Sequence, residues 1–355
     1  MKILYVSNRY DYMNPERGGG FEHYNFYHTL KTMNRGGNEV IYFAVDELIR
    51  KESKEEINKK LLSIAYAEKP DFLWFSPGGD IISKETVKEL TEKSGATTMI
   101  WMSDDHWAFE KSSKYWAPLF HWVSTTDSKA PEKYKRIGCN NVIKTQWAYN
   151  PSACKKIDLP KIYDVTFIGQ PHSHRRVLID KLIKNGINVQ CWGFGWKNGR
   201  ISQEDMINKI CQSKICLNFS KSSGILWKEL ANLFLRRRMY DRKIMINSPR
   251  RIVDNFKAFP STMRTNQIKG RNFEVPACGS FFLTEYADNL DSYYKIGEEI
   301  VCFSGIKDLE EKIKYYLNHE EERERIARAG YERTLKEHTY EKRFNQMFKV
   351  MGLIK

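Results

Sequence analysis

A chain of 355 residues exceeds the size at which one hydrophobic core usually stops growing, so two domains are expected. Hydrophobic residues make up 41% of the chain and charged residues 29%, a composition that excludes a disordered or fibrous protein. The net charge of +14 is compatible with nucleic acid, an anionic membrane surface or a phosphorylated ligand, so the distribution of the basic residues has to decide among them.

The N-terminal apolar run, residues 1–8, is too short for the core of a signal peptide or for a membrane span, which predicts a cytoplasmic protein. The seven cysteines are odd in number and scattered, and none forms a Cys-x-x-Cys pair. We therefore expect free thiols in a reducing compartment rather than disulfides or a zinc site.

Strands and helices alternate through the first part of the chain. Residues 2–7 indicate a buried strand, and a glycine-containing loop leads from it to an aromatic-rich helix at 21–33. Further strands are predicted at 38–45, 72–76, 97–102, 122–125 and 141–145, with helices at 51–69 and 83–94. This alternation predicts a parallel sheet in a Rossmann-like domain.

A second α/β domain is predicted after a polar linker that contains Asn150, Pro151 and Pro160. Its strands are expected at 165–168, 187–192, 215–219, 280–284 and 300–303, with helices at 203–212, 309–317 and 320–338. We predict domains over 1–158 and 159–337, and a helical tail over 338–355 that crosses back to the N-terminal lobe. Parallel open sheets bind ligands at the carboxyl ends of their strands, so chemistry is expected in the loops that follow strands.

The most informative stretch runs from Lys269 to Tyr286 and reads KGRNFEVPACGSFFLTEY. It predicts a short helix that carries Glu274, closes at Gly279 and leads into a hydrophobic strand. A glutamate at the rim of such a loop can accept two hydrogen bonds from ribose hydroxyls, a contact worth about 1.5–3 kcal/mol. The alternative is a solvated helix glutamate.

This stretch resembles the donor site of CgeB-like (spore-maturation type) glycosyltransferases, a group similar to the family-4 type of GT-B enzymes. The resemblance continues through residues 297–299, 308–309 and 338–340. It implies two Rossmann-like domains facing a central cleft, and sugar transfer from a nucleotide-diphosphate sugar to a hydroxyl of a glycan, protein or lipid-linked acceptor. Family-4 enzymes usually carry another glutamate eight positions before the one matching Glu274, and here that position is Asn266.

A second element of the implied donor site follows the predicted strand at 165–168. Family-4-like enzymes place a basic residue six positions after a glycine here, which corresponds to Gly169 and Arg175. Their arginine beside the glycine is Gln170 in this chain, so the matching charge is expected from Lys269 or Arg271. Helix N-termini and fixed cations can neutralise a diphosphate without metal.

The implied donor-binding residues are thus Gly169, Arg175, Lys269, Arg271, Glu274 and Gly279. GT-A enzymes usually hold a divalent ion on an Asp-x-Asp at the end of a strand, and none of the predicted strands ends in that motif. We therefore expect no cofactor and no metal. Without the resemblance, the arginine pair that starts at Arg175 would more often be solvated.

The first domain offers candidates for the acceptor side. The predicted strand at 97–102 is followed by Asp105, which could remove the proton of the acceptor hydroxyl, and by His106, which could stabilise developing charge. A structural capping role is the alternative for both residues.

A glycine triplet, Gly18, Gly19 and Gly20, precedes the first predicted helix. In similar enzymes this loop faces the donor phosphate, where backbone N–H groups at a helix start meet an anion. Glu22 and His23 are alternative bases at the same place. A merely flexible turn is the other interpretation of the glycines.

Basic residues are concentrated between Lys221 and Arg271, where thirteen stand against three acidic ones, a local excess of +10. Apolar residues at helical spacing precede the arginines, so the segment 221–264 could lie on an anionic membrane or bind an acidic acceptor, or simply pack as a helix with a basic edge. Nucleic-acid binding is not expected, because the basic residues are not interleaved with aromatic ones on a sheet. An epimerase or hydrolase that uses a nucleotide sugar is the second functional hypothesis.

Overall fold

The computed structural model describes residues 1–355 apart from 77–79, 173, 222–225, 239–240 and 242. The chain forms two compact units, described separately below. The first unit comprises residues 1–146, 230–261 and 343–355, and the second comprises 147–229 and 262–342. The predicted boundaries at 158 and 337 differ from this division chiefly because residues 230–261, which we expected in the second domain, pack with the first unit.

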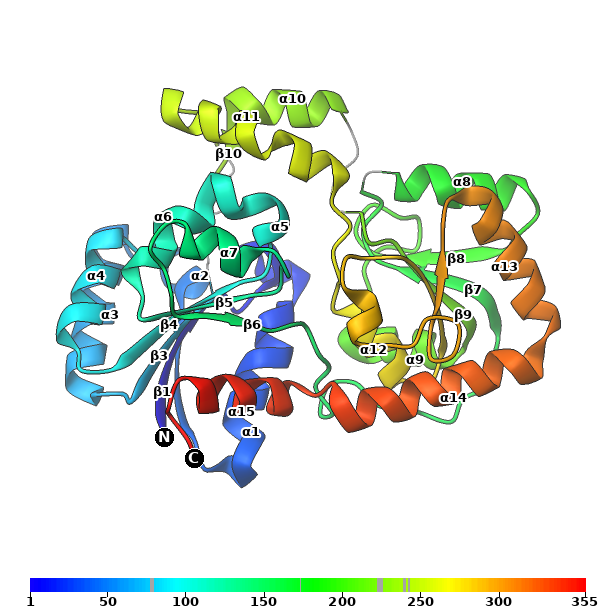
Figure 1. Cartoon of the computed structure of the whole chain (residues 1–355), viewed down its shortest axis with the longest axis horizontal. Coiled ribbons are helices and arrows are strands. Elements are labelled where there is room, and N and C mark those ends of the chain that lie inside the picture. The colour runs from blue at the N-terminus through cyan, green and yellow to red at the C-terminus, as the bar shows by residue number, and fades with distance from the viewer. Residues whose placement is uncertain (77–79, 173, 222–225, 239–240, 242) are drawn as a thin grey trace. The chain divides into compact units, whose positions relative to one another are not determined.

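The first unit is built on a six-stranded parallel sheet with the order β2-β1-β3-β4-β5-β6. Its strands are β1 (Lys2–Ser7), β2 (Glu39–Ala44), β3 (Phe72–Phe75), β4 (Thr97–Met102), β5 (Trp122–Thr125) and β6 (Val142–Lys144). All six were predicted. The central strands β3 and β4 are buried along almost their whole length because helices cover both faces of the sheet (Figure 1).

The helices of the first unit connect these strands. They are α1 (His28–Gly36), α2 (Val45–Leu48), α3 (Lys54–Glu68), α4 (Lys84–Lys93), α5 (Asp105–Ala108), α6 (Lys114–Trp116) and α7 (Ala130–Lys135). Shorter turns are η1 (Asp11–Met13), η2 (Pro15–Arg17), η5 (Ala117–Leu119) and the π-helical η3 (His23–Tyr27) and η4 (Phe109–Ser113). The start of α3 is fixed by a capping box in which Ser53 and Glu56 bond each other's backbone N–H groups.

The C-terminal helix α15 (Tyr340–Val350) also packs on the first sheet. The ring of Phe344 lies 4.7 Å from that of Trp74, and the ring of Phe348 lies 5.5 Å from that of Phe72. Edge-on aromatic contacts of this kind add to the burial of apolar area. The tail therefore returns to the N-terminal unit, as the sequence predicted.

Residues 226–264 form a helix-ribbon-helix insert, which we call the insert. It consists of α10 (Leu226–Phe234), β10 (Leu235–Arg237), β11 (Ile244–Ile246) and α11 (Pro249–Arg264), and the two helices lie side by side. The side chains of Asn247 and Asn255 both donate to the carbonyl of Leu233 at 3.0 Å, which closes the end of α10. Sequence analysis had predicted only the first of these helices.

The second unit is a five-stranded parallel sheet with the order β13-β12-β9-β7-β8. Its strands are β7 (Tyr163–Ile168), β8 (Val189–Trp192), β9 (Ser213–Asn218), β12 (Phe281–Glu285) and β13 (Val301–Phe303). The helices are α8 (Arg175–Lys184), α9 (Gln203–Cys211), α12 (Arg271–Ala277), α13 (Ile306–Asn318) and α14 (Glu320–Glu337), with the short turn η6 (Leu290–Ser292). Each unit thus has the predicted Rossmann-like α/β architecture.

Candidate functional site

The carboxyl ends of β7, β9 and β12 bring polar side chains together on one edge of the second sheet. Parallel strands point the same way, so the loops that follow them share that edge. At the end of β9, Asn218 donates its side-chain amide to the hydroxyl of Thr284 on β12 at 2.9 Å. Both residues are buried, so the floor of this edge is a fixed polar surface.

Arg175, the first residue of α8, lies at this edge. Its guanidinium donates to the carbonyl of Phe219 at 3.2 Å and to that of Gln170 at 3.3 Å, so it bridges the ends of β9 and β7. The arginine is only half-buried, which leaves its charge available to a ligand. A guanidinium held by carbonyls at the start of a helix suits an anion.

A histidine and a glutamate that sequence analysis did not single out join the same edge. His174 Nε2 lies 2.6 Å from a carboxylate oxygen of Glu285, the last residue of β12. The other oxygen of Glu285 accepts the backbone N–H of Ser220 at 2.8 Å and that of Lys221 at 3.2 Å. Burial would raise the pKa of Glu285, but the bonds from His174 and these N–H groups hold the pKa below its usual range.

Helix α12 supplies the other predicted donor residues. The amide of Asn218 lies 3.4 Å from Oδ1 of Asn272, so α12 starts beside the end of β9. The same oxygen accepts the backbone N–H of Lys269 at 2.9 Å, which fixes the turn before the helix. One turn into α12, the buried carboxylate of Glu274 forms an ion pair with Arg271. Any ribose hydroxyl that reaches Glu274 would therefore bind a carboxylate that already has one cationic partner.

The segments that carry Arg175 and α12 are linked by a short stretch of backbone pairing. Phe219, which binds Arg175, precedes Ser220, whose carbonyl accepts the N–H of Gln267 at 3.1 Å. Lys221 forms an isolated antiparallel bridge with Asn266, the residue that replaces the family-4 glutamate. These contacts thus bring Arg175 and the start of α12 to the same edge of the sheet, with the Arg271–Glu274 pair in the first turn of that helix.

Two predicted glycines have different positions. Gly169 follows β7, and a Cβ atom on Gly193, whose φ is +136°, would lie 2.4 Å from the carbonyl oxygen of Gly169, so the loops after β7 and β8 approach closely. Gly279 lies at the opposite edge, because Ser280 beside it donates to Ile210, which precedes β9. Helix α12 runs against the strand direction, and its two ends therefore reach opposite edges. The structure separates Gly279 from the other predicted donor residues.

In the first unit, Asp105 is fully buried, which does not suit the predicted acceptor base. Its carboxylate accepts the hydroxyl of Tyr134 at 2.8 Å. Burial raises the pKa of Asp105 to about 6, although hydrogen bonds with Ser113, Thr125 and Tyr134 act in the opposite direction. Because an acceptor hydroxyl has no open path to this group, the structure supports the structural alternative for Asp105.

His106 is buried next to a second inward-facing carboxylate. Burial would raise the pKa of Asp127, but the charges of His106 and Lys133 and the N–H of Lys129 keep it below its usual value. Lys133 lies 2.8 Å from Asp127. The pairing of His106 with this carboxylate explains its inward position better than contact with an acceptor.

Glu22 and His23, the other two predicted bases, are both half-buried. Glu22 lies at the turn that precedes η3. Burial raises the pKa of Glu22, and the carboxylates of Asp104 and Asp11 raise it further, while its own backbone N–H lowers it. His23 instead stacks on Tyr27 and Tyr42, and burial lowers its pKa to about 4. The ring of His23 is thus neutral and held in an aromatic cluster.

Backbone N–H groups of the glycine triplet already donate hydrogen bonds within their own loop. The N–H of Gly18 donates to Pro15 at 2.9 Å, and the N–H of Gly20 donates to Arg9 at 2.7 Å. Asp46, fully buried, accepts the N–H of Arg9 and of Tyr10 at 2.8 Å each, and so holds the start of the loop. Two of the three glycine N–H groups therefore already have acceptors, which weakens the predicted phosphate cradle.

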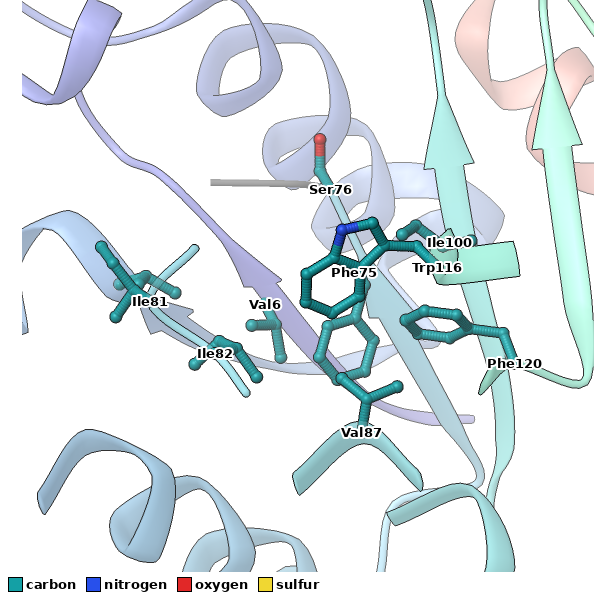
Figure 2. Close-up of a pocket in the computed structure, with 10 residues that line it drawn as sticks. Val6, Phe75, Ser76, Ile81, Ile82, Val87, Ile100, Trp116 and Phe120 are labelled. Atoms are coloured by element: carbon teal, nitrogen blue, oxygen red, sulfur yellow. The ribbon is translucent and has the colours of Figure 1, made fainter. Parts of the chain in front are cut away.

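An apolar cavity of about 40 Å³ lies in the first unit (Figure 2). Val6, Phe75, Val87, Ile100 and Phe120 line it, with the edge of Trp116 beside them. It has room for one or two methyl groups and is far smaller than a sugar. The cavity is therefore a packing void in the core and not a substrate pocket.

Comparison with known proteins gives consistent results. Residues 174–349 match the family model described as glycosyl transferase-like. The spore protein CgeB of Bacillus subtilis is 22% identical over 277 residues, which cover 78% of this chain and 81% of CgeB. The chain is a homologue of CgeB.

Solved structures show the fold of this CgeB homologue. HepE of Anabaena, in complex with UDP, superposes with a TM-score of 0.59 at 9% identity over 100% of both chains. Sucrose-phosphate synthase of Thermosynechococcus elongatus gives 0.62 at 11% identity over 99% and 98% of the two chains. A glycosyltransferase of Rickettsia africae gives 0.61 at 10% identity with the same coverage. The predicted GT-B fold is confirmed.

Within the described residues of the chain, no helix is long and apolar enough to cross a membrane.

Sequence reasoning missed His174 and Glu285, which are 111 positions apart. Each lies within a stretch that was already quoted for other residues. A carboxylate directly after the strand predicted at 280–284 was the available signal for Glu285.

Proposed function

We propose that the protein transfers a sugar from a nucleotide-diphosphate sugar to a hydroxyl of a glycan, protein or lipid-linked acceptor, without a metal ion. The observation that supports the proposal is the carboxyl edge of the second sheet, where Arg175 bonds the carbonyl of Phe219 and helix α12, which carries the Arg271–Glu274 ion pair, starts beside the end of β9. Cationic side chains can form ion pairs with a diphosphate, and a carboxylate can accept hydrogen bonds from ribose hydroxyls. The glycosyl transferase-like match over residues 174–349 covers this edge.

Fixed cations take the place of a metal in this proposal. Negative charge develops on the leaving diphosphate as the bond between it and the sugar breaks. Positive groups that are already in place stabilise that charge without reorganising. Arg175 is held by two carbonyls and His174 by Glu285, so neither has to move into place. Arg271, paired with Glu274, would orient the carboxylate toward the ribose.

For the acceptor side we propose Glu22 as the base. A general base works best when its pKa approaches the working pH, and the pKa of Glu22 is raised by burial and by Asp104. Asp105 and His106 are buried and bonded within the unit, so they are less suited.

The test is a thermal-shift panel of UDP, GDP, CMP and dTDP sugars, each with and without EDTA, on the wild-type chain and on Glu274→Gln. A bound donor should raise the melting temperature in the wild type, because a ligand specific to the folded state stabilises it, and EDTA should not change the shift. Glu274→Gln should lose most of the shift. Glu310→Gln, which removes a half-buried carboxylate paired with Lys314 and Asn185, is the matched control and should keep it.

A full shift in Glu274→Gln would refute the ribose assignment, and a shift abolished by EDTA would refute metal independence. The epimerase or hydrolase alternative is separated by incubating the stabilising donor alone. Rapid, complete turnover without acceptor would favour that alternative over transfer.

A further inference from the structure

The insert exposes an unusual share of the apolar surface of the chain. Nine of the twenty-one exposed large apolar side chains in the described structure lie between Leu226 and Phe256, a stretch of less than a tenth of the sequence. They are Leu226, Trp227, Leu230, Phe234, Leu235, Ile244, Ile246, Val253 and Phe256. Apolar side chains clustered in this way mark an interaction surface, whereas scattered ones do not.

The ribbon of the insert has one face that is both apolar and basic. Leu235 is paired with Ile246 and Arg237 with Ile244, and directly opposed residues point to the same side of a ribbon. All four are exposed, and the two isoleucines are 69% and 80% exposed. A three-residue ribbon gains nothing for its own stability from isoleucines in water.

The helix α11 continues the basic character. Arg250 and Lys257 line an open groove with Val253, and Arg250 lies 4.6 Å over the ring of Tyr115. The acidic residue of that groove, Asp254, is 2.8 Å from Lys114 and is thus neutralised within the unit. The groove therefore presents positive charge beside an apolar side chain.

Two arginines of the insert repel each other. Burial lowers the pKa of Arg251, and the charge of Arg236 lowers it further, while the carboxylates of Asp80 and Asp254 raise it. An anion near the two guanidinium groups would relieve their repulsion.

We infer that the insert lies on an anionic membrane surface, with Leu235, Ile244 and Ile246 at the boundary between headgroups and acyl chains and the basic residues at lipid phosphates. Surfaces that combine exposed apolar side chains with lysine and arginine bind at the membrane interface, between headgroups and acyl chains. Each basic residue near an anionic leaflet adds to the affinity. An acidic protein partner would account for the charge but not for the two exposed isoleucines on the face of the ribbon. This inference concerns location and stands apart from the sugar-transfer proposal.

The experiment is co-sedimentation of the full chain with vesicles of phosphatidylcholine alone or mixed with phosphatidylglycerol, at low and high salt. We expect binding to the mixed vesicles only, weakened by salt. Ile244→Ser combined with Ile246→Ser should lower the partition coefficient about tenfold for each residue, because an isoleucine loses its burial in the boundary. The control is Ile162→Ser with Val350→Ser, two apolar residues of similar exposure outside the insert, and should bind like the wild type.

Lysine replacements give a second arm, Lys243→Gln with Lys257→Gln, which should reduce binding mainly at low salt. The inference is overturned if the wild type stays in the supernatant with mixed vesicles, or if the serine pair in the ribbon binds as well as the control pair. It is also overturned if sedimentation velocity shows a dimer that the ribbon variant alone dissociates, because the face then contacts a second copy. Donor-dependent thermal shifts should be equal in all these variants, so failure of this inference leaves the sugar-transfer proposal intact.

Discussion

The two units use the carboxyl edges of similar sheets for different purposes. In the second unit the edge keeps Arg175 and His174 partly exposed beside carboxylates that orient cations. In the first unit three aspartates near the strand ends, Asp46, Asp105 and Asp127, are buried and hold loops or neighbouring side chains. The second edge thus keeps Arg175 half-buried, and we propose that it contacts the donor diphosphate, whereas the buried carboxylates of the first unit fix its own loops.

This contrast explains why candidate functional residues are easier to identify in the second unit than in the first. A diphosphate requires several fixed cations, and these leave a recognisable cluster. Removal of one proton from a hydroxyl requires a single base with a suitable pKa. In the first unit only a half-buried carboxylate such as Glu22 meets that need, because its buried neighbours are already bonded.

The strongest way to break this comparison is Glu22→Gln. Loss of a general base typically slows the chemical step by about 100- to 10,000-fold, and the glutamine keeps the size of the side chain. We expect that loss in kcat with the donor identified by the thermal-shift panel, while donor binding is unchanged. In the wild type the acid limb of kcat/KM should lie above the usual range for a glutamate, because the pKa of Glu22 is raised.

Asp105→Asn is the counterpart of that variant and should affect stability rather than rate. An acid whose folded-state pKa is raised contributes stability below its unfolded pKa and loses it as the pH rises through the folded value, here about 6. Titration of Asp105 should thus lower the free energy of unfolding by up to about 3 kcal/mol between pH 4 and pH 7, a component that the asparagine lacks. A large loss of kcat in Asp105→Asn with unchanged kcat in Glu22→Gln would reverse our assignment.

On the donor side, Arg175→Gln should weaken binding of the nucleotide sugar about 10- to 100-fold, because hydrogen bonds to charged groups carry that much energy. Titration calorimetry measures the change. The adjacent Arg176→Gln is the matched control: Arg176 is exposed, donates to the carbonyl of Gly195 and stacks 4.6 Å from Trp196, so its loss should leave donor affinity nearly unaltered. Equal effects of the two variants would mean that general positive charge, and not the position of Arg175, attracts the donor.

Local sequence was sufficient for the strands of the two sheets and for the helix that carries Glu274. The apolar runs predicted the strands of both sheets, and the stretch from Lys269 onward predicted a helix that carries Glu274. It was not sufficient for contacts between distant segments. The bond from His174 to Glu285 joins the loop after β7 to the end of β12, and only the sheet order β12-β9-β7, with β9 between the two strands, brings them within reach. The bond to Asp105 comes from Tyr134, on a helix 29 residues later.

Gly279 illustrates a different limit. It lies five residues after Glu274, and a motif treats such neighbours as one site. A helix of seven residues rises about 10 Å, however, which carries the chain from one edge of the sheet toward the other. The direction of α12 relative to the strands, which the motif does not contain, therefore decides which of its residues can meet a donor.

The smallest expected effect concerns the cavity of the first unit. Val87→Ile adds one methylene next to a void of about 40 Å³, and a buried methylene is worth about 0.8 kcal/mol when it fits without strain. We expect a slightly higher free energy of unfolding in urea and no change in kcat or KM, since the void belongs to the core. A raised KM for the acceptor would show that this apolar space receives part of the substrate. The first unit would then contain a binding site, although the comparison of the two sheet edges proposes one only in the second unit.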